Sequence, residues 1–277
     1  MTNKYKIYRL NLTQQRFEGF LKTPVLWSSN TVYNLTQFQI EHQSISFDIE
    51  INSKQRLGKY VERFVSFQLS QDLSIEVIAE NVQISKDKIT LGELDCLLYQ
   101  NGNPIHLEVI YKFYIYDSDI GDDELACWIG PNRKDSLLEK LDKLKQKQLP
   151  LLHSDECLDY LKTIPIDAST IWQQVYFKAQ LFIPLDTKNV SFSKINKDCV
   201  VGFYIHHKDL GLHKFKEAKF YIPNKKDWLM VPHTNVNWMS YKDFATTCDP
   251  YLDREFSPMC WIKSQHGELQ KFFLIWW

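Results

Sequence analysis

The clearest pattern along the chain is a stripe of apolar residues at mainly helical spacing, which begins after the first fifty or so positions. Its members are Leu57, Val61, Phe64, Val65, Phe67 and Leu69. This spacing predicts an amphipathic helix from Gly58 to about Ser70, with Glu62 at the edge of its apolar stripe. Residues 1–56 mix short apolar runs with polar, turn-prone stretches, and we expect them to form an extension packed on the core.

Three extended runs follow, each rich in Val, Ile, Leu and aromatic residues. They cover Ser74–Ile84, Leu91–Gln100 and Ile105–Tyr116, and their composition predicts β-strands. The last two are joined through Asn101-Gly102, a pair that tolerates the positive backbone angles of a type I′ hairpin turn. After an acidic loop, a long helix is expected from about Lys134 to Leu149, so the predicted order is α-β-β-β-α.

The remainder of the chain predicts further strands and no repeat. The expected strands are Val175–Ile183, Val200–His206 and Ala218–Ile222. The apolar C-terminal run Phe272–Trp277 is expected to dock in a core, because free tails are usually polar. We therefore expect an α/β protein in which residues 57–185 form the core and residues 186–277 form a C-terminal extension, a candidate substrate-binding region.

Composition narrows the class of protein. The chain of 277 residues, 44% hydrophobic and 24% charged, is typical of a soluble globular protein with one large domain. No run approaches the ~20 apolar residues that cross a bilayer, and no signal peptide is recognisable at the start, so we expect a cytoplasmic protein that does not enter a membrane. Six scattered cysteines without a C-x-x-C pair predict free, mostly buried thiols. A net charge of -1 argues against a histone-like binder but not against a nuclease.

The predicted hairpin brings two carboxylates together. If the turn holds two residues, its register places Asp95 opposite Glu108, and like charges at such positions destabilise a sheet by up to ~1 kcal/mol. A divalent cation, or a proton shared by the two groups, would offset this repulsion. Lys112 lies on the same strand face as Glu108, as phosphodiester hydrolysis would require. Two alternatives remain: a solvated face of an edge hairpin, or a three-residue loop that turns Asp95 to the opposite face.

Glu62 in the first helix, Gly92-Glu93-Leu94-Asp95 on the second strand and Glu108-Val109-Ile110-Tyr111-Lys112 on the third resemble the PD-(D/E)-x-K nuclease superfamily. The resemblance implies a restriction-endonuclease-like αβββαβ core with Mg²⁺ or Mn²⁺. It implies Asp95 and Glu108 as metal ligands, with the carbonyl of Val109 as a third, Lys112 as the catalytic lysine and Glu62 as an auxiliary acid. The usual spacing is Glu-x-Lys, whereas here Lys112 follows Glu108 by four positions, which shifts it roughly 6 to 7 Å along an ideal strand.

A second resemblance is to the bacterial proteins grouped as domain of unknown function 1853. It rests on Leu57-Gly58-Lys59-Tyr60-Val61-Glu62, His106-Leu107-Glu108, Lys112-Phe113 and the stretch from Gly130-Pro131-Asn132 through Gln148-Leu149, and extends weakly to Trp228-Leu229 and the C-terminal region. Gln148 continues the inward stripe of the long helix, and exonuclease-like members of the nuclease superfamily carry such a Gln-Leu pointing toward the site. The alternative is a Gln that caps the helix at the solvent margin.

Lysines on the long helix and in a later cluster are candidates for tracking a phosphate backbone. They are Lys140, Lys143, Lys147, Lys214 and Lys216. An ordinary solvated surface explains them as well. The histidines and Cys199 lack the paired spacing of a zinc site.

The leading hypothesis is a Mg²⁺- or Mn²⁺-dependent nuclease that acts on DNA. Its rival is a catalytically inactive nuclease-like module that binds nucleic acid or scaffolds a protein complex, for which the shifted Lys112 is the sequence hint. A third reading is a purely structural α/β protein.

Overall fold

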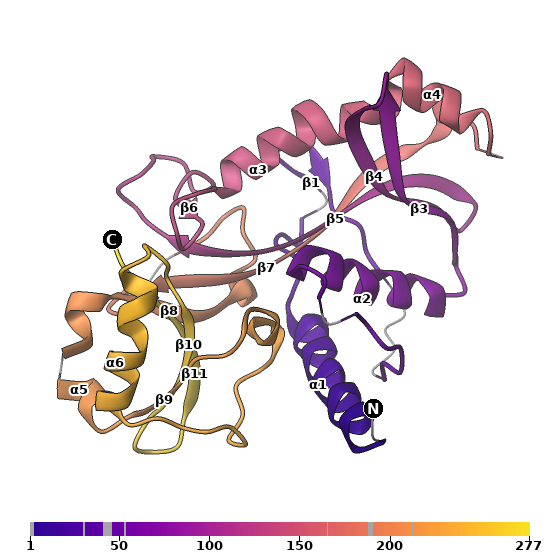
Figure 1. The fold of residues 1–277 in the computed structure, drawn as a ribbon. Helices are drawn as coiled ribbons and strands as arrows, with labels where there is room; N and C mark the ends of the chain where they lie inside the picture. The colour runs from indigo at the N-terminus through magenta and orange to yellow at the C-terminus, as the bar shows by residue number, and fades with distance from the viewer. Residues whose placement is uncertain are drawn as a thin grey trace. The chain divides into compact units, whose positions relative to one another are not determined.

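The computed structural model describes residues 3–29, 31–40, 46–52, 54–164, 166–187, 191–211 and 213–277, with side chains from residue 12 onward except those of 213 and 214. The chain forms two compact units, each drawn from separate stretches (Figure 1). The hairpin unit consists of Val25–Tyr111 and Leu138–Lys178. The C-terminal unit consists of Met1–Pro24, Lys112–Leu137 and Ala179–Trp277.

The hairpin unit contains the helix and strands that the apolar pattern predicts. The helix is α2 (Leu57–Gln71), and the strands are β3 (Ile75–Lys86), β4 (Ile89–Gln100) and β5 (Asn103–Tyr116). The strands hydrogen-bond in the order β3-β4-β5-β7, where β7 covers Trp172–Pro184. β1 (Thr31–Val32) and β2 (Leu35–Thr36) form a small separate sheet.

The turn between β4 and β5 has the predicted geometry. Asn101 and Gly102 adopt φ values of 50° and 78°, and Gln100 pairs with Asn103. The predicted two-residue loop and the register that it sets are thereby confirmed. The paired positions extend from Gln100 opposite Asn103 to Cys96 opposite Leu107. Asp95 and Glu108 are the next residues along their strands.

The helix predicted from Lys134 begins later than expected, which corrects the predicted boundary. It starts as α3 (Leu137–Lys143), because Arg133 adopts a left-handed φ of 54° and Ser136 forms a β-bridge with Ile129. The backbone then widens into a π-helical segment, Leu144–Gln148, and tightens into a 3-10 segment, Leu149–His153. The predicted inward stripe is fully buried and consists of Leu137, Leu141 and Leu144.

The end of this helical region leads into α4 (Asp155–Leu161), which covers part of the hairpin. Leu152 and Leu161 pack with Leu94 and Leu97 of β4 in one apolar cluster. This cluster packs β4 against the 3-10 segment that directly follows Gln148.

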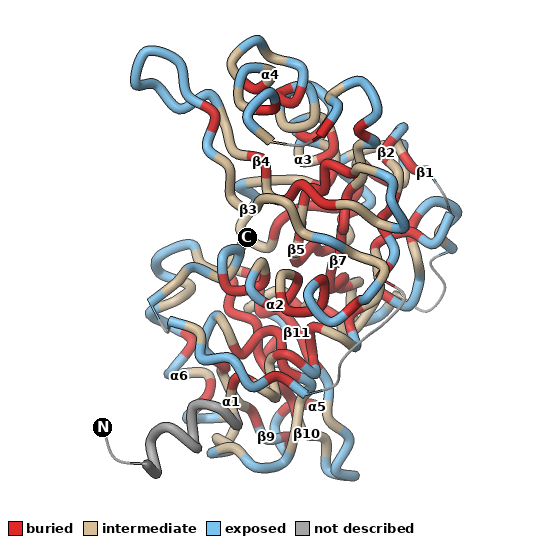
Figure 2. The backbone as a smooth tube through the Cα atoms, turned by 90° about the vertical axis from the view of Figure 1, so that its right-hand side faces the viewer, coloured by how far each residue is buried: buried red, intermediate tan, exposed pale blue. Residues whose placement is uncertain are grey.

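The C-terminal unit contains a mixed sheet in the order β7-β8-β11-β10-β9, and β6 (Trp128–Ile129) pairs with the end of β5. Its strands are β8 (Val200–His206), β9 (Lys219–Tyr221), β10 (Met259–Lys263) and β11 (Leu269–Ile275). β8 runs parallel to both β7 and β11, whereas β10 runs antiparallel to its neighbours. The predicted strands are confirmed. Within the apolar C-terminal run, residues 272–275 form the buried end of β11 (Figure 2), and Trp276 and Trp277 lie half-buried beyond it.

The helices of this unit are α1 (Asn3–Lys22), α5 (His213–Lys216) and α6 (Tyr241–Leu252). On one sheet face, Phe244 and Cys248 of α6 pack with Phe220 and Phe272. The sequence pattern gave no helix in the first fifty residues, so α1 is a structural feature that it missed. Short 3-10 segments cover Ala168–Thr170, Lys197–Cys199, His207–Gly211 and Lys225–Leu229.

The structure is therefore of the mixed α/β class with a large mixed sheet, as expected. All six cysteines are free and buried, which confirms the prediction from their spacing. Within the described part of the chain, no helix has the length and apolar character needed to span a bilayer.

Candidate functional site

Asp95 and Glu108 occupy the place where the paired positions of the hairpin end. Asp95 does not remain in the regular ladder; instead its Oδ2 accepts a hydrogen bond of 2.9 Å from the backbone N–H of Val109. The carboxylate of Asp95 is thus tied to the strand that carries Glu108, through the residue directly after it.

The register of the hairpin leads to Asp95 and Glu108 as neighbours, and the charge of Glu108 acts on Asp95. Burial, followed by the charge of Glu108, raises the pKa of Asp95 from an ordinary 3.8 to about 7, although the Val109 N–H lowers it. Glu62 also raises this pKa and Lys59 lowers it. At neutral pH the Asp95 carboxyl is therefore partly protonated, and a cation beside it would restore its charge.

Glu108 is fully buried, and both of its carboxylate oxygens are hydrogen-bonded. Gln148 donates through Nε2 to Oε2, and His106 lies with its Nε2 3.2 Å from Oε1. Such contacts fix the orientation of a carboxylate as outer partners do around metal ligands.

The hydrogen bonds of Gln173 indicate which ring nitrogen of His106 accepts and which donates. Gln173 donates through Nε2 to the carbonyl of Leu149, which can only accept, and the same Nε2 lies 3.1 Å from Nδ1 of His106. Nδ1 of His106 therefore accepts, and its proton on Nε2 points to Glu108. His106 is fully buried, with one partner at each ring nitrogen.

Gln148 reaches Glu108 from the π-helical segment after α3. Its Oε1 accepts from Nζ of Lys140 at 2.7 Å, which leaves its Nε2 to donate to Glu108. Single π-helical turns within helices often occur at functional sites, because they redirect a side chain. The alternative of a Gln that caps the helix at the solvent margin does not describe this contact.

Glu62 and Lys59 extend the acidic cluster from α2. Lys59 Nζ lies 2.9 Å from Glu62 Oε2 and also forms an ion pair with Glu93 of β4 and a hydrogen bond with Asn81. Burial raises the pKa of Glu62 above its ordinary value, although Lys59 opposes this effect. We call Glu62, Glu93, Asp95 and Glu108 the carboxylate cluster.

Lys112 belongs to the C-terminal unit, and its partner there is Asp135. Its Nζ lies 2.6 Å from Oδ2 of Asp135, in an ion pair that is about one-third exposed on the lysine side. The structure therefore gives Lys112 a carboxylate partner of its own, outside the carboxylate cluster.

The candidate phosphate-binding lysines have different surroundings. Lys143 and Lys147 are exposed on the helical region, Lys140 contacts Gln148, and Lys216 is exposed in α5. The side chain of Lys214 lies outside the described residues.

Three contributors to the site were not assigned a role from the sequence: His106, Gln173 and Lys59. His106 is two positions before Glu108 and so on the same strand face, which was an available signal. Lys59 precedes Glu62 by three positions on one helix, a spacing that lets the two side chains meet. Gln173 has no local signal, because its partner is 67 positions away in the chain.

Together the fold and the cluster define a mixed α/β protein whose β-hairpin carries a carboxylate pair, with Glu108 buried and Asp95 half-buried. The family described as domain of unknown function (DUF1853) matches residues 13–273, and the chain belongs to that family. The match includes every residue of the carboxylate cluster. No curated protein sequence and no solved structure matches the chain.

Proposed function

We propose that the protein is a divalent-metal-dependent nuclease that hydrolyses phosphodiester bonds in DNA, built on a restriction-endonuclease-like core. The observation that carries the proposal is the pair of Asp95 and Glu108 where the pairing of β4 and β5 ends: Asp95 is hydrogen-bonded to the Val109 N–H, and the charge of Glu108 raises the pKa of Asp95. The element order α2-β3-β4-β5-α3-β7, with β6 inserted before α3 and α4 inserted after it, supports the proposed core.

The donor set fits Mg²⁺ or Mn²⁺. A hard cation of this size is usually bound by one or two carboxylates together with water and substrate phosphate oxygens. Among the described residues no group of three or more His, Cys, Asp or Glu side chains is arranged to hold a metal by itself. The proposed site therefore uses Asp95 and Glu108, with the carbonyl of Val109 as a third ligand, and is completed by the substrate.

When bound, the cation would polarise the phosphate and promote ionisation of the attacking water. The chain's own residues hold the ligands in position. The Val109 N–H fixes Asp95, and Gln148 and His106 fix the two oxygens of Glu108. Glu62, whose pKa is raised by burial, is suited to accept or hold a proton beside Asp95.

Two lysines are candidates for the ammonium group that would offset phosphate charge. Lys112 was predicted from the motif, four positions after Glu108. Lys59 is the ammonium group that acts on Asp95, since it lowers the pKa of that carboxyl. We assign the role to Lys59 and retain Lys112 as a contact to the substrate backbone, alongside exposed Lys143 and Lys147.

The rival function is a catalytically inactive nuclease-like module that binds nucleic acid or scaffolds a complex. One observation favours it: Lys112 is engaged with Asp135. In that case the carboxylate cluster would be a structural remnant and would have no measurable preference for a divalent cation.

The experiment combines Mn²⁺ titration by calorimetry with cleavage of single-stranded, linear duplex and supercoiled DNA, and of RNA. Asp95→Asn and Glu108→Gln are expected to weaken Mn²⁺ binding and abolish cleavage, while the exposed-site controls Asp122→Asn and Glu76→Gln leave both unchanged. Lys59→Met is expected to abolish cleavage but retain Mn²⁺ binding. Nucleic-acid binding by the wild type without Mn²⁺ binding or cleavage would refute the nuclease proposal in favour of the module.

A further inference from the structure

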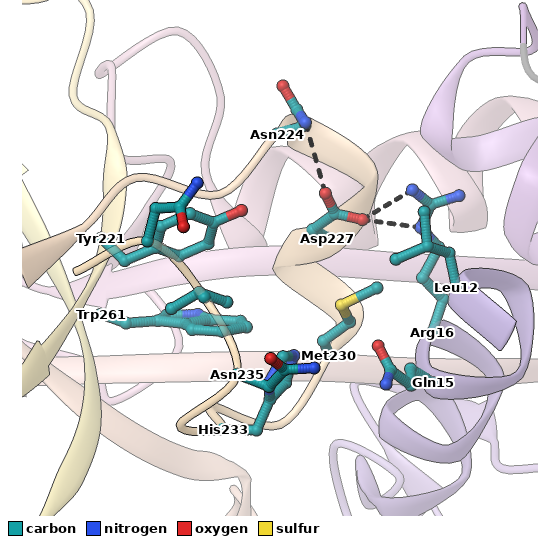
Figure 3. Close-up of a pocket in the computed structure, with 12 residues that line it drawn as sticks. Leu12, Gln15, Arg16, Tyr221, Asn224, Asp227, Met230, His233, Asn235 and Trp261 are labelled. Carbon is teal, nitrogen blue, oxygen red and sulfur yellow. Dashed lines mark hydrogen bonds and ion pairs between the residues drawn. The ribbon is translucent and has the colours of Figure 1, made fainter. Parts of the chain in front are cut away.

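A pocket of about 430 Å³ lies in the C-terminal unit (Figure 3). It is lined by α1, by the paired strands β9 and β10, and by the segment from Asn224 to Asn237. None of its lining residues belongs to the carboxylate cluster or to the hairpin unit. The pocket is therefore a separate candidate binding site.

Aromatic rings form one wall of this pocket. Tyr221 of β9 and Trp261 of β10 are directly paired, and their ring centroids lie 5.2 Å apart. His233 packs edge-on against Trp261, also at 5.2 Å. Figure 3 shows the rings of Tyr221 and Trp261 side by side, across the pocket from Leu12 and Arg16 of α1. The two rings are inclined at 52° to each other and Trp261 is fully buried, so a planar group can stack on the ring of half-buried Tyr221.

Carboxamide side chains supply much of the polar lining. They are Gln15, Asn224, Asn235 and Asn237. Each carries both a donor and an acceptor. Within the described part of the chain, the amides of Gln15, Asn235 and Asn237 form no hydrogen bond with protein groups. The indole N–H of Trp261 is buried and also has no partner there.

The charged groups of the lining satisfy each other. Arg16 forms an ion pair of 2.7 Å with Asp227, which also accepts a hydrogen bond from Asn224. Both members of the pair are largely buried. In the described lining, amide groups are thus the donors and acceptors open to a ligand, and the arginine that could bind a phosphate group is already paired with Asp227.

We propose that this pocket binds a nucleobase, either in a free nucleoside or as an unpaired base of a single strand. The face of the base would stack on Tyr221, which packs on buried Trp261, as bases do on aromatic side chains in single-strand-binding proteins. Its edge would pair with the carboxamides, because Asn and Gln match the adjacent donor and acceptor of a base. The volume lies within the range of small-molecule sites.

The first experiment is calorimetric titration with adenosine, guanosine, cytidine and uridine, with ribose and methyl glucoside as non-base ligands. We expect at least one nucleoside to bind and the sugars not to bind. Tyr221→Leu and Asn235→Ala are each expected to weaken binding about tenfold, since stacking contributes ~1–3 kcal/mol per base and a hydrogen bond ~0.5–1.5 kcal/mol. Asn103→Ala, at the exposed hairpin turn, serves as the control and should bind as the wild type does.

The second arm distinguishes the two sources of the base. If the pocket receives an unpaired base, a short single-stranded oligonucleotide will compete with the nucleoside and the fully paired duplex will not. If it receives a free nucleoside, neither will compete. Both arms are repeated in Asp95→Asn, which should bind nucleosides as the wild type does. Nucleoside binding therefore tests the pocket even if the nuclease proposal fails.

Two results would overturn the proposal. They are nucleosides that bind no better than ribose or methyl glucoside, and binding that is unaffected by both Tyr221→Leu and Asn235→Ala when circular dichroism shows that these variants are folded.

Discussion

Gln148 donates a hydrogen bond to the carboxylate of Glu108 across 40 positions of sequence. The contact connects the π-helical segment after α3 to β5 of the hairpin. The other carboxylate oxygen of Glu108 contacts His106. A buried carboxylate held on both sides in this way has one orientation available, which suits a metal ligand.

Gln148→Leu should weaken both metal binding and stability. The substitution leaves one oxygen of buried Glu108 without a donor, which costs ~1–3 kcal/mol. The loss of an outer hydrogen bond to a ligand typically lowers metal affinity by ~10–100-fold. Urea unfolding and Mn²⁺ titration measure the two effects. Lys147→Ala, an exposed neighbour, is the control, and unchanged Mn²⁺ affinity in Gln148→Leu would show that Glu108 does not hold the ion.

Asp95 should make the protein less stable as pH rises. Its folded-state pKa of about 7 exceeds the ordinary 3.8, so the folded state holds a proton that the unfolded state releases. Stability therefore falls as pH increases through this window and stays low above it. Asp95→Asn should gain stability over the wild type progressively from about pH 4 to pH 7, and keep that gain at pH 8.

Urea unfolding at pH 4.5, 6 and 8 measures this difference, with Asp122→Asn as the control. Added Mn²⁺ should stabilise the wild type at pH 8 more than Asp95→Asn, since the cation offsets the charge of the carboxylate pair. A constant difference between the variants at all three pH values would mean that Asp95 titrates normally in the folded state.

The parts of the fold that the sequence predicted are those with strong local signals. Val200–His206 was predicted with the same limits that the structure shows, and the helix expected over Gly58–Ser70 is α2, one residue longer at each end. The hairpin was predictable because Asn101-Gly102 fixes its own turn and therefore the register of both strands. That register was sufficient to bring Asp95 near Glu108.

The parts that were missed depend on partners distant in the chain. Helix α1 has a weakly amphipathic sequence, and its Gly19 packs closely against the carbonyl of Leu229. The π-helical turn before Gln148 has no recognised sequence signature, and the contact of His106 with Gln173 appears only once the strands are assembled. The position of Lys112 beside Asp135 likewise depends on a loop whose course the sequence pattern did not give.

Two helical glycines should respond oppositely to alanine. A Cβ at Gly19 would lie 2.0 Å from the backbone oxygen of Leu229, so Gly19→Ala forces the backbone apart and should destabilise the protein by ~1–3 kcal/mol. At Gly58 of α2 a Cβ meets nothing within 4 Å, so Gly58→Ala should be neutral or stabilise by up to ~1 kcal/mol. Urea unfolding of both variants tests the pair, and equal effects would contradict the close packing of α1.

Lys271 should give a second, separate pH dependence. Its Nζ is buried and donates to Gln180 and to the carbonyl of Trp228, both at 2.7 Å, and burial lowers its pKa from 10.5 to about 7. Between these values the unfolded state binds a proton that the folded state does not hold. Stability therefore rises with pH from about 7 to about 10, in the window above that of Asp95.

Lys271→Met should flatten this rise in a series of urea unfolding curves between pH 7 and 10. The substitution also removes the donor from two buried acceptors, which lowers stability at every pH. Lys263→Met, near the end of neighbouring β10, is the control and should retain the slope; a slope that persists in Lys271→Met would assign the titration to another group.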